Sequence, residues 1–160
     1  AENIPPRFAA NNRLRGFKRS PYEGGVRSPM IVWGGGVKKG IQTDLPSAHW
    51  DFMATACDLA GIYPPTDTDG ISYLPTLKGQ KQAKSHDFLY FEFHEQGKWQ
   101  TVRQGNYKLV YHHRANQYEL YDLSKDPAEK QNLVATLPEV FERLKVTLRS
   151  QHQPNPKWTF

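Results

Sequence analysis

The chain has 160 residues, which suits one domain of ordinary size or a small domain joined to part of a larger one. Its formal charge of +5 could attract nucleic acid, acidic glycans or an anionic substrate. The basic residues are spread along the sequence, however, and favour the simpler interpretation of a mildly basic protein. The single cysteine, Cys57, excludes an internal disulfide framework and a multi-cysteine zinc site.

The first residues, AENIPPRFAANN, offer few large apolar side chains and look like the cut end of a longer chain. On that expectation, the lack of a signal peptide or a transmembrane run says nothing about export. A dense basic group follows at 13–19, and residues 26–33, VRSPMIVW, end in an apolar run bounded by three glycines. This run predicts a short buried strand, which Pro29 limits at its beginning.

Residues 44–61 predict a helix, because apolar residues recur at three- and four-residue spacing and Gly61 closes the pattern. Cys57 lies on the apolar stripe, which indicates a buried packing residue rather than a nucleophile. A turn-rich loop, YPPTDTDG, follows at 63–70. The next segment, ISYLPTLKG, has room only for a short helical turn or two.

From His86 onward, four short apolar and aromatic runs with tight links predict an antiparallel meander. The segment TLPE at 136–139 matches a capping box and predicts a last helix. The apolar face of that helix is formed by Leu137, Phe141, Leu144 and Leu148. The expected fold class is therefore α+β, with a four-stranded antiparallel sheet packed by a carboxy-terminal helix.

No active site is complete by residue pattern alone. The six histidines include His112 and His113, whose side chains would point to opposite faces of a strand and make poor joint metal ligands. Asp67 and Asp69 faintly resemble a calcium loop, but its downstream ligands are missing, so a turn is the better interpretation. The sequence also lacks phosphate loops, dinucleotide fingerprints, metalloprotease helices and nucleophile elbows.

Four segments, in order, resemble the sulfatase family. GFKRSPYEGGVRSPMIVW at 16–33 is similar to the family's G-x-K-x-x-x-Y/F-E-G-G-x-R-x-P segment, and TDLPSAHWDFMATACDLAGI at 43–62 resembles its helix ending in D-L-A-G. DTDGISYLPTLKG at 67–79 and YELYDLSKDPAEKQNLV at 118–134 resemble two further signatures. The resemblance covers residues 14–150 and is strongest to bacterial arylsulfatases and galactosamine-6-sulfatases.

This resemblance implies an alkaline-phosphatase-like enzyme that hydrolyses sulfuric esters. Residues 1–80 are then expected to be the carboxy-terminal remnant of the large α/β domain, with its last strand and helix, and residues 81–160 the small sheet-and-helix domain. Family catalysis uses calcium and a formylglycine made from the Cys or Ser of C/S-x-P-x-R. Neither that motif nor the calcium ligands occur here, so both cofactors are expected only in the full-length enzyme, and the isolated chain is expected to be inactive.

The resemblance also assigns roles to particular residues. Lys18 matches the family lysine that contacts the substrate sulfate and helps the leaving oxygen to depart, and an ammonium offers three donors to an anion. Residues 22–27 would form the scaffold of this turn, with Glu23 paired to Arg27. His94 and Arg103 are expected to border the substrate groove.

The expected partners are a sulfated small molecule or glycan and the missing amino-terminal domain, with no nucleic acid and no membrane. The full-length form is expected in the periplasm or secreted. Two alternatives stay open: a stand-alone module that binds sulfated glycan or another anion, and a phosphodiesterase or phosphonate hydrolase of the same superfamily. Apolar residues within 14–62, without the large domain's sheet to cover, further predict self-association. These are Ile31, Val32, Trp50 and Phe52.

Overall fold

The computed structural model describes residues 13–95 and 97–157, which form two compact units. The sheet unit combines residues 13–28 with residues 90–157, and the helical unit spans residues 29–89. The elements in chain order are α1 (Glu23–Val26), α2 (Asp51–Ala60), α3 (Leu74–Leu77), β1 (Leu89–Phe93), β2 (Trp99–Gln104), β3 (Tyr107–His112), β4 (Gln117–Asp122) and α4 (Pro138–Gln151). Within the described chain, no helix is long and apolar enough to cross a membrane.

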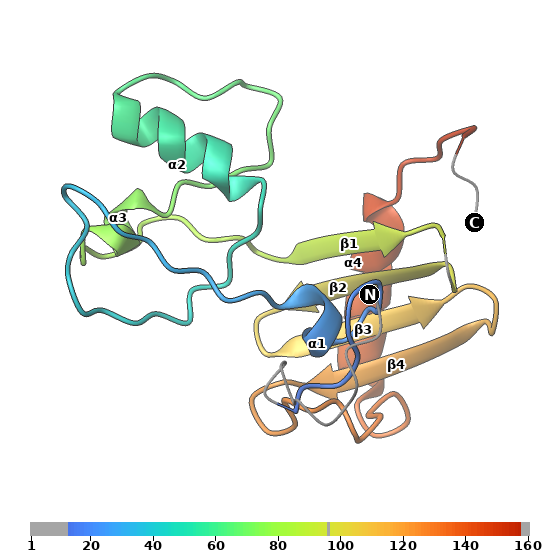
Figure 1. The fold of residues 1–160 in the computed structure, drawn as a ribbon. Coiled ribbons are helices and arrows are strands. Elements are labelled where there is room, and N and C mark those ends of the chain that lie inside the picture. Colours follow the sequence, from blue (N-terminus) through green and yellow to red (C-terminus); the bar gives the residue numbers. More distant parts are fainter. Residues whose placement is uncertain (1–12, 96, 158–160) are drawn as a thin grey trace. The chain divides into compact units, whose positions relative to one another are not determined.

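The four strands follow one another in the order β1-β2-β3-β4 (Figure 1). β2 and β3 pair antiparallel with Val102 opposite Leu109, and β3 pairs with β4 with Leu109 opposite Leu120. Gly105, at the turn between β2 and β3, has φ +58, a left-handed conformation that suits glycine. The meander predicted from the short links is confirmed.

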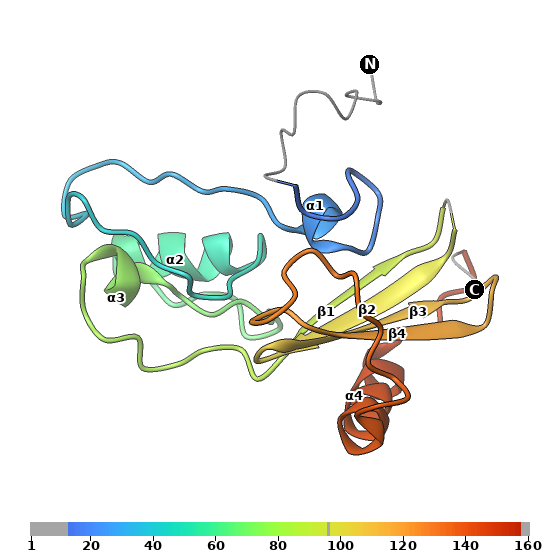
Figure 2. The same cartoon turned by 90° about the horizontal axis from the view of Figure 1, so that it is seen from below.

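The two faces of the sheet are covered by different elements, with α4 on one side and α1 on the other (Figure 2). Val102, Leu109 and Leu120 are fully buried, as are Leu144 and Leu148 of α4. Side chains alternate between the faces of a strand, so these apolar residues form one continuous layer against the helix. The predicted α+β unit is therefore confirmed.

The capping box predicted at 136–139 does not form. The residue that caps α4 is Leu137, which has no side-chain capping bond, and Pro138 occupies the first turn. The Thr136 hydroxyl donates instead to the carbonyl of Leu133, at 3.1 Å. A proline at the first helical position needs no backbone donor there, so this helix begins without the predicted side-chain cap.

The helical unit is organised around Asp51, whose side chain is almost completely buried. One carboxylate oxygen accepts the backbone N–H of Ala48 at 2.7 Å, and the other accepts that of Ile71 at 2.9 Å and contacts His86 Nε2 at 2.7 Å. The helix predicted over 44–61 therefore begins only at Asp51. It ends as predicted at Gly61, which has φ +71, and Cys57 is buried, which confirms its packing role.

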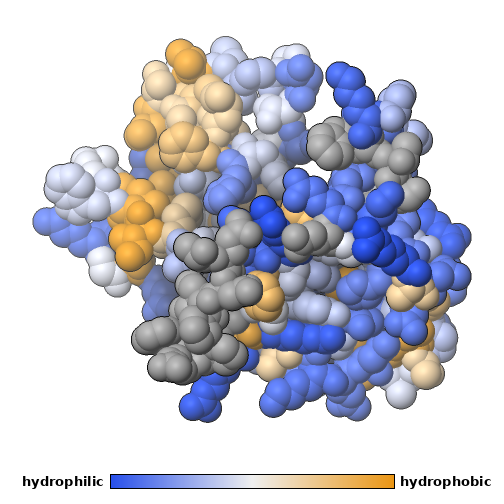
Figure 3. Space-filling view, turned by 45° about the vertical axis from the view of Figure 1, so that its right-hand side comes forward, coloured by the Kyte–Doolittle hydropathy of each residue, from blue (hydrophilic) through white to orange (hydrophobic). Residues whose placement is uncertain are grey.

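The strand predicted at 26–33 is not among the elements of the described chain. Ile31 is 95% exposed and Trp33 is 93% exposed, whereas a buried strand needs neighbouring strands to satisfy its backbone groups. Figure 3 shows further apolar side chains around α2, where Phe52 and Met53 are exposed.

The boundary expected near residue 80 concerns a longer protein and stays a prediction. In this chain, residues 13–28 belong to the sheet unit. The side chains of Arg15, Tyr22 and Glu23 all bond to residues of the sheet, which explains this assignment.

Candidate functional site

The loop over residues 16–20 carries Lys18, which is exposed. Ser20 N–H donates to the carbonyl of Phe17 at 3.0 Å and closes a tight turn. Arg19 has φ +73, and its carbonyl accepts the indole N–H of Trp99 at 3.0 Å. The indole therefore ties the backbone beside Lys18 to the beginning of β2, while the lysine itself reaches solvent.

The glycines of the Y-E-G-G segment allow α1 to sit directly against this loop. A Cβ at Gly25 would lie 2.4 Å from the carbonyl oxygen of Ser20 and 2.6 Å from that of Phe17, distances that real side chains do not adopt. Gly24 N–H donates to the carbonyl of Arg15 at 2.8 Å. The backbone of α1 thus forms the inner wall of the Lys18 loop.

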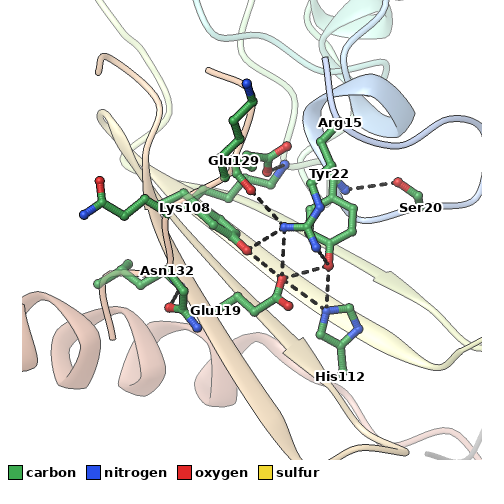
Figure 4. A network of polar contacts seen from close by, with 12 residues as sticks. Arg15, Ser20, Tyr22, Lys108, His112, Glu119, Glu129 and Asn132 are labelled. Carbon is green, nitrogen blue, oxygen red and sulfur yellow. Dashed lines mark hydrogen bonds and ion pairs between the residues drawn. The ribbon is translucent and has the colours of Figure 1, made fainter. Parts of the chain in front are cut away.

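Arg15 connects this loop to β4. Its guanidinium donates to the hydroxyls of Tyr121 and Tyr22, at 2.7 and 2.8 Å, and lies 3.6 Å from the centre of the Tyr22 ring (Figure 4). The same guanidinium donates to the backbone carbonyl of Glu129 at 2.9 Å. A planar group with five donors suits this arrangement of several acceptors.

Glu119 of β4 binds the same two tyrosines as Arg15. It accepts bonds from the hydroxyls of Tyr22 and Tyr121, both at 2.8 Å, and lies 3.5 Å from His112 Nε2 (Figure 4). Burial alone would raise its pKa, but the bonds from His112 and the two tyrosines lower the pKa of Glu119 to about 2. Burial, with the bond to Glu119, raises the pKa of each tyrosine, so both hydroxyls remain donors.

A second cluster, which is more deeply buried than the group around Arg15 and Glu119, contains Lys108, Glu23 and Glu129. Lys108 is 1% exposed, and its ammonium lies 2.9 Å from Glu23 Oε1 and 2.9 Å from Glu129 Oε1. Glu129 is fully buried, and its Oε2 accepts the backbone N–H of Glu23 at 2.6 Å. Burial raises the pKa of Glu129, while Lys108 opposes the shift.

The three residues predicted for the site fall in different surroundings. Lys18 lies on the loop. Arg103 lies on β2 and approaches Glu23 Oε2 at 3.9 Å, whereas His94 follows β1 and contacts Glu92 Oε1 at 2.9 Å. The two predicted groove residues therefore belong to two separate clusters of the sheet unit.

The His94 cluster also involves the end of α4. His152 Nδ1 lies 3.0 Å from Glu92 Oε2, and the hydroxyl of Tyr90 donates to the same oxygen. Burial would raise the pKa of Glu92, but the bonds from Tyr90, His152 and His94 lower it to about 2. Glu92 is therefore the residue that all members of this cluster contact, and His94 is one of these three partners.

Sequence reasoning missed Arg15, Lys108 and Glu129. It expected Arg27 as the partner of Glu23, whereas the Glu23 carboxylate binds Lys108. The sequence did mark Glu129 as part of the D-P-A-E stretch at 126–129. In the structure its side chain reaches Glu23, the first residue of the E-G-G stretch. Two motifs about 100 residues apart thus meet in one buried cluster.

Residues that could hold a metal ion do not gather in the described parts of the chain: no three His, Cys, Asp or Glu side chains form such a group there. The described residues therefore do not supply the ligands for the calcium ion that the sulfatase resemblance implies. No chemical step in this chain is therefore assigned to a metal.

Comparison with known proteins gives the same family as the sequence motifs. Residues 16–154 match the family model described as N-sulphoglucosamine sulphohydrolase, C-terminal. A Delta 4,5-hexuronate-2-O-sulfatase from Bacteroides thetaiotaomicron is 38% identical over 132 residues, which cover 78% of this chain and 27% of that protein. The chain therefore spans about a quarter of the length of this relative.

Two solved structures are also similar. One, described with the metabolism of multiple glycosaminoglycans by Bacteroides thetaiotaomicron, has a TM-score of 0.67 at 28% identity and covers 87% of this chain and 32% of its own. The other, a phosphonate monoester hydrolase from Silicibacter pomeroyi, has a TM-score of 0.54 at 21% identity, covers 72% of this chain and 26% of its own, and indicates a shared fold alone. On the family match and the four motifs together, this chain belongs to the sulfatase family, of which it matches the carboxy-terminal part.

Proposed function

We propose that this chain is the carboxy-terminal part of a hydrolase that cleaves aryl or carbohydrate sulfate esters, and that Lys18 binds the sulfate. The observation that carries the proposal is the loop itself. Its backbone is tied to Trp99 and to α1, yet Lys18 is exposed, so a cation is presented to solvent from a fixed backbone. A fixed loop loses little freedom when an anion binds.

Lys18 would act on the charge of the sulfate group. An ammonium can donate three hydrogen bonds to sulfate oxygens, and a cation already in place stabilises negative charge that develops as the ester bond breaks. The nucleophile and the calcium site belong, on this proposal, to the remainder of the protein. His94 and Arg103 would border the groove that receives the rest of the substrate.

The sulfated substrate is proposed to be a sugar. The relative from Bacteroides thetaiotaomicron is a hexuronate-2-O-sulfatase, and the similar structure is described with glycosaminoglycan metabolism. We also propose a periplasmic or secreted location for the whole protein, which is what the resemblance to bacterial sulfatases implies.

The first test is sulfate release by the whole protein that contains this chain, with 2-O-sulfated unsaturated uronic acid disaccharides and a chromogenic aryl sulfate as substrates. We expect hydrolysis by the whole protein and none by residues 1–160 alone. Robust turnover by the isolated chain that Lys18→Ala abolishes would contradict the division of roles proposed here.

A phosphonate monoester or phosphodiester hydrolase is the second candidate, because the fold is shared with such an enzyme. Both anions would bind a lysine, so the site in this chain does not separate them. Parallel assays of the whole protein with aryl sulfate and aryl phosphonate esters distinguish the two. Faster cleavage of the phosphonate would favour the second candidate.

A sulfated-glycan-binding module is the third candidate, since Lys18 and Arg19 lie side by side in a chain of charge +5. Binding of the chain to heparin that weakens with salt, and that disappears when both residues are changed to Ala, would support it. No binding at low salt would exclude it.

The exposed apolar residues of the helical unit bear on partners. Of the four residues predicted to self-associate, Ile31 and Phe52 are more than half exposed, Val32 is 38% exposed and Trp50 is only partly exposed. We propose that the amino-terminal domain covers them in the whole protein and that the isolated chain self-associates through them. A monomer at high concentration in light scattering would count against self-association.

A further inference from the structure

Lys108, Glu23 and Glu129 form a buried ionic cluster to which the proposed function gives no role. Lys108 is 1% exposed and Glu129 is fully buried. Taking such charges out of water is costly, and well-packed apolar residues of similar size often stabilise a protein as well or better. Stability alone therefore does not explain the cluster, and its connections have to be considered.

The connections converge on Glu129 from both ends of the Lys18 loop. At the beginning of the loop, Arg15 donates to the backbone carbonyl of Glu129 at 2.9 Å. After the loop, the backbone N–H of Glu23 donates to Glu129 Oε2 at 2.6 Å, and both carboxylates share the ammonium of Lys108. One residue thus holds the two ends of the segment that contains Lys18.

Glu129 is itself fixed in an unusual conformation. Its φ is +53, a region that side chains other than glycine seldom adopt. Asp126 holds the turn: its carbonyl accepts the N–H of Glu129 at 3.1 Å, and its Oδ2 accepts the N–H groups of Lys130 and Gln131 at 2.7 and 2.8 Å. The D-P-A-E stretch therefore presents a preformed acceptor to the loop.

We propose that Glu129, together with Lys108, is a positioning clamp that fixes both ends of the 15–23 segment and so sets Lys18 against the substrate sulfate. The catalytic part of this inference rests on the proposed function. Glu129 and Lys108 are buried and do not touch the substrate. They act through the loop, in the way that supporting residues hold a reacting group in place.

The clamp is tested on the chain itself by hydrogen exchange. In Glu129→Gln, which keeps the shape but removes the charge, the amides of Gly24 and Gly25 should exchange at least about 10-fold faster, because their bonds to the carbonyls of Arg15 and Tyr22, which flank the loop, open more often. The amide of Leu109 in β3 should keep its protection, which shows that the sheet is intact. Lys125→Met, at a lysine that is 83% exposed on its side chain, serves as the control and should change neither.

Unchanged exchange at Gly24 and Gly25 in Glu129→Gln would overturn the clamp, whatever the activity of the protein. Lys108→Met, which removes the shared cation, should loosen the same amides further. If Lys108→Met unfolds the sheet instead, Glu129→Gln still tests the clamp, because that variant leaves Lys108 paired with Glu23.

The link to Lys18 is tested by a double-mutant cycle in the whole protein. Glu129→Gln should lower kcat for sulfate release about 10-fold or more in the parent, but have little further effect when Lys18 is already Ala. Equal effects in both backgrounds would show a general structural role and overturn the inference. If Lys18→Ala releases sulfate at the parent rate, the proposed function and the catalytic part of this inference are overturned. The hydrogen-exchange result would still decide whether Glu129 fixes the ends of the 15–23 segment.

Discussion

Replacement of Lys108 by Met should destabilise the sheet unit strongly. The ammonium lies 2.9 Å from carboxylate oxygens of both Glu23 and Glu129, and its loss leaves two buried carboxylates without their shared cation. Breaking a buried pair by removing one partner costs about 3 to 5 kcal/mol. The expected loss of free energy of unfolding is of that size near neutral pH.

The loss should depend on pH in a defined direction. Burial already raises the pKa of Glu129 above its usual value, and without Lys108 this pKa rises further. A raised pKa in the folded state means that the protonated carboxyl is accommodated at low pH, and that stability is lost as the pH rises through the folded pKa. The difference between variant and parent should therefore be smaller at about pH 5 than at about pH 8.

Urea unfolding, followed through the NMR signals of the β3 backbone amides, measures this difference at both pH values. Lys125→Met is the matched control, because its side chain is 83% exposed, and it should remain within about 0.5 kcal/mol of the parent. A loss below about 1 kcal/mol at the higher pH, or an equal loss at both, would refute the account of the buried cluster.

Three further predictions concern other parts of the chain. Gly25→Ala should destabilise the sheet unit by more than about 1 kcal/mol, because its Cβ would lie 2.4 Å from a backbone carbonyl oxygen, whereas Gly35→Ala, with open space around it, should be tolerated in the same thermal unfolding assay. Leu148→Ala should cost about 2 to 5 kcal/mol, because the side chain is fully buried, and Val146→Ala, at a side chain that is 67% exposed, should cost far less; urea titration compares the two. Because the pKa of Glu119 is lowered from 4.5 to about 2, its stabilisation is complete above pH 4.5 and is lost as the pH falls toward 2. We expect acid titration to lower the free energy of unfolding by roughly 1 to 3 kcal/mol over this range. The decrease with pH should be less steep in Glu119→Gln, and an equal slope in the two proteins would contradict this role of Glu119.

The elements that the sequence predicted well are those whose signals are local. Alternation and tight links gave the meander, and the three- and four-residue spacing of Leu144 and Leu148 gave the buried face of α4. Gly61 was identified as the end of α2 because a left-handed residue closes a helix. In each case the deciding residues lie within a few positions of one another.

The features that the sequence did not predict depend on distant partners. The start of α2 depends on Asp51, whose side chain binds Ile71, and the strand at 26–33 would need neighbouring strands to form. The two clusters that contact the ends of the Lys18 loop join residues far apart in the sequence, such as Arg15 and Glu129, which are 114 positions apart. A single sequence contains no signal for pairing at such distances, although its motifs marked Lys18, Glu23 and Glu129 as parts of family segments.

The most direct test of the account is the rate of sulfate ester hydrolysis by the whole protein with Lys18→Ala, compared with Lys125→Ala as a control of equal charge change. Removing a donor that stabilises developing charge costs about 100-fold or more in kcat, so a loss of that size is predicted for Lys18→Ala, with the parent rate retained in the control. A Lys18→Ala protein that releases sulfate at the parent rate would contradict the role of this loop in sulfate binding.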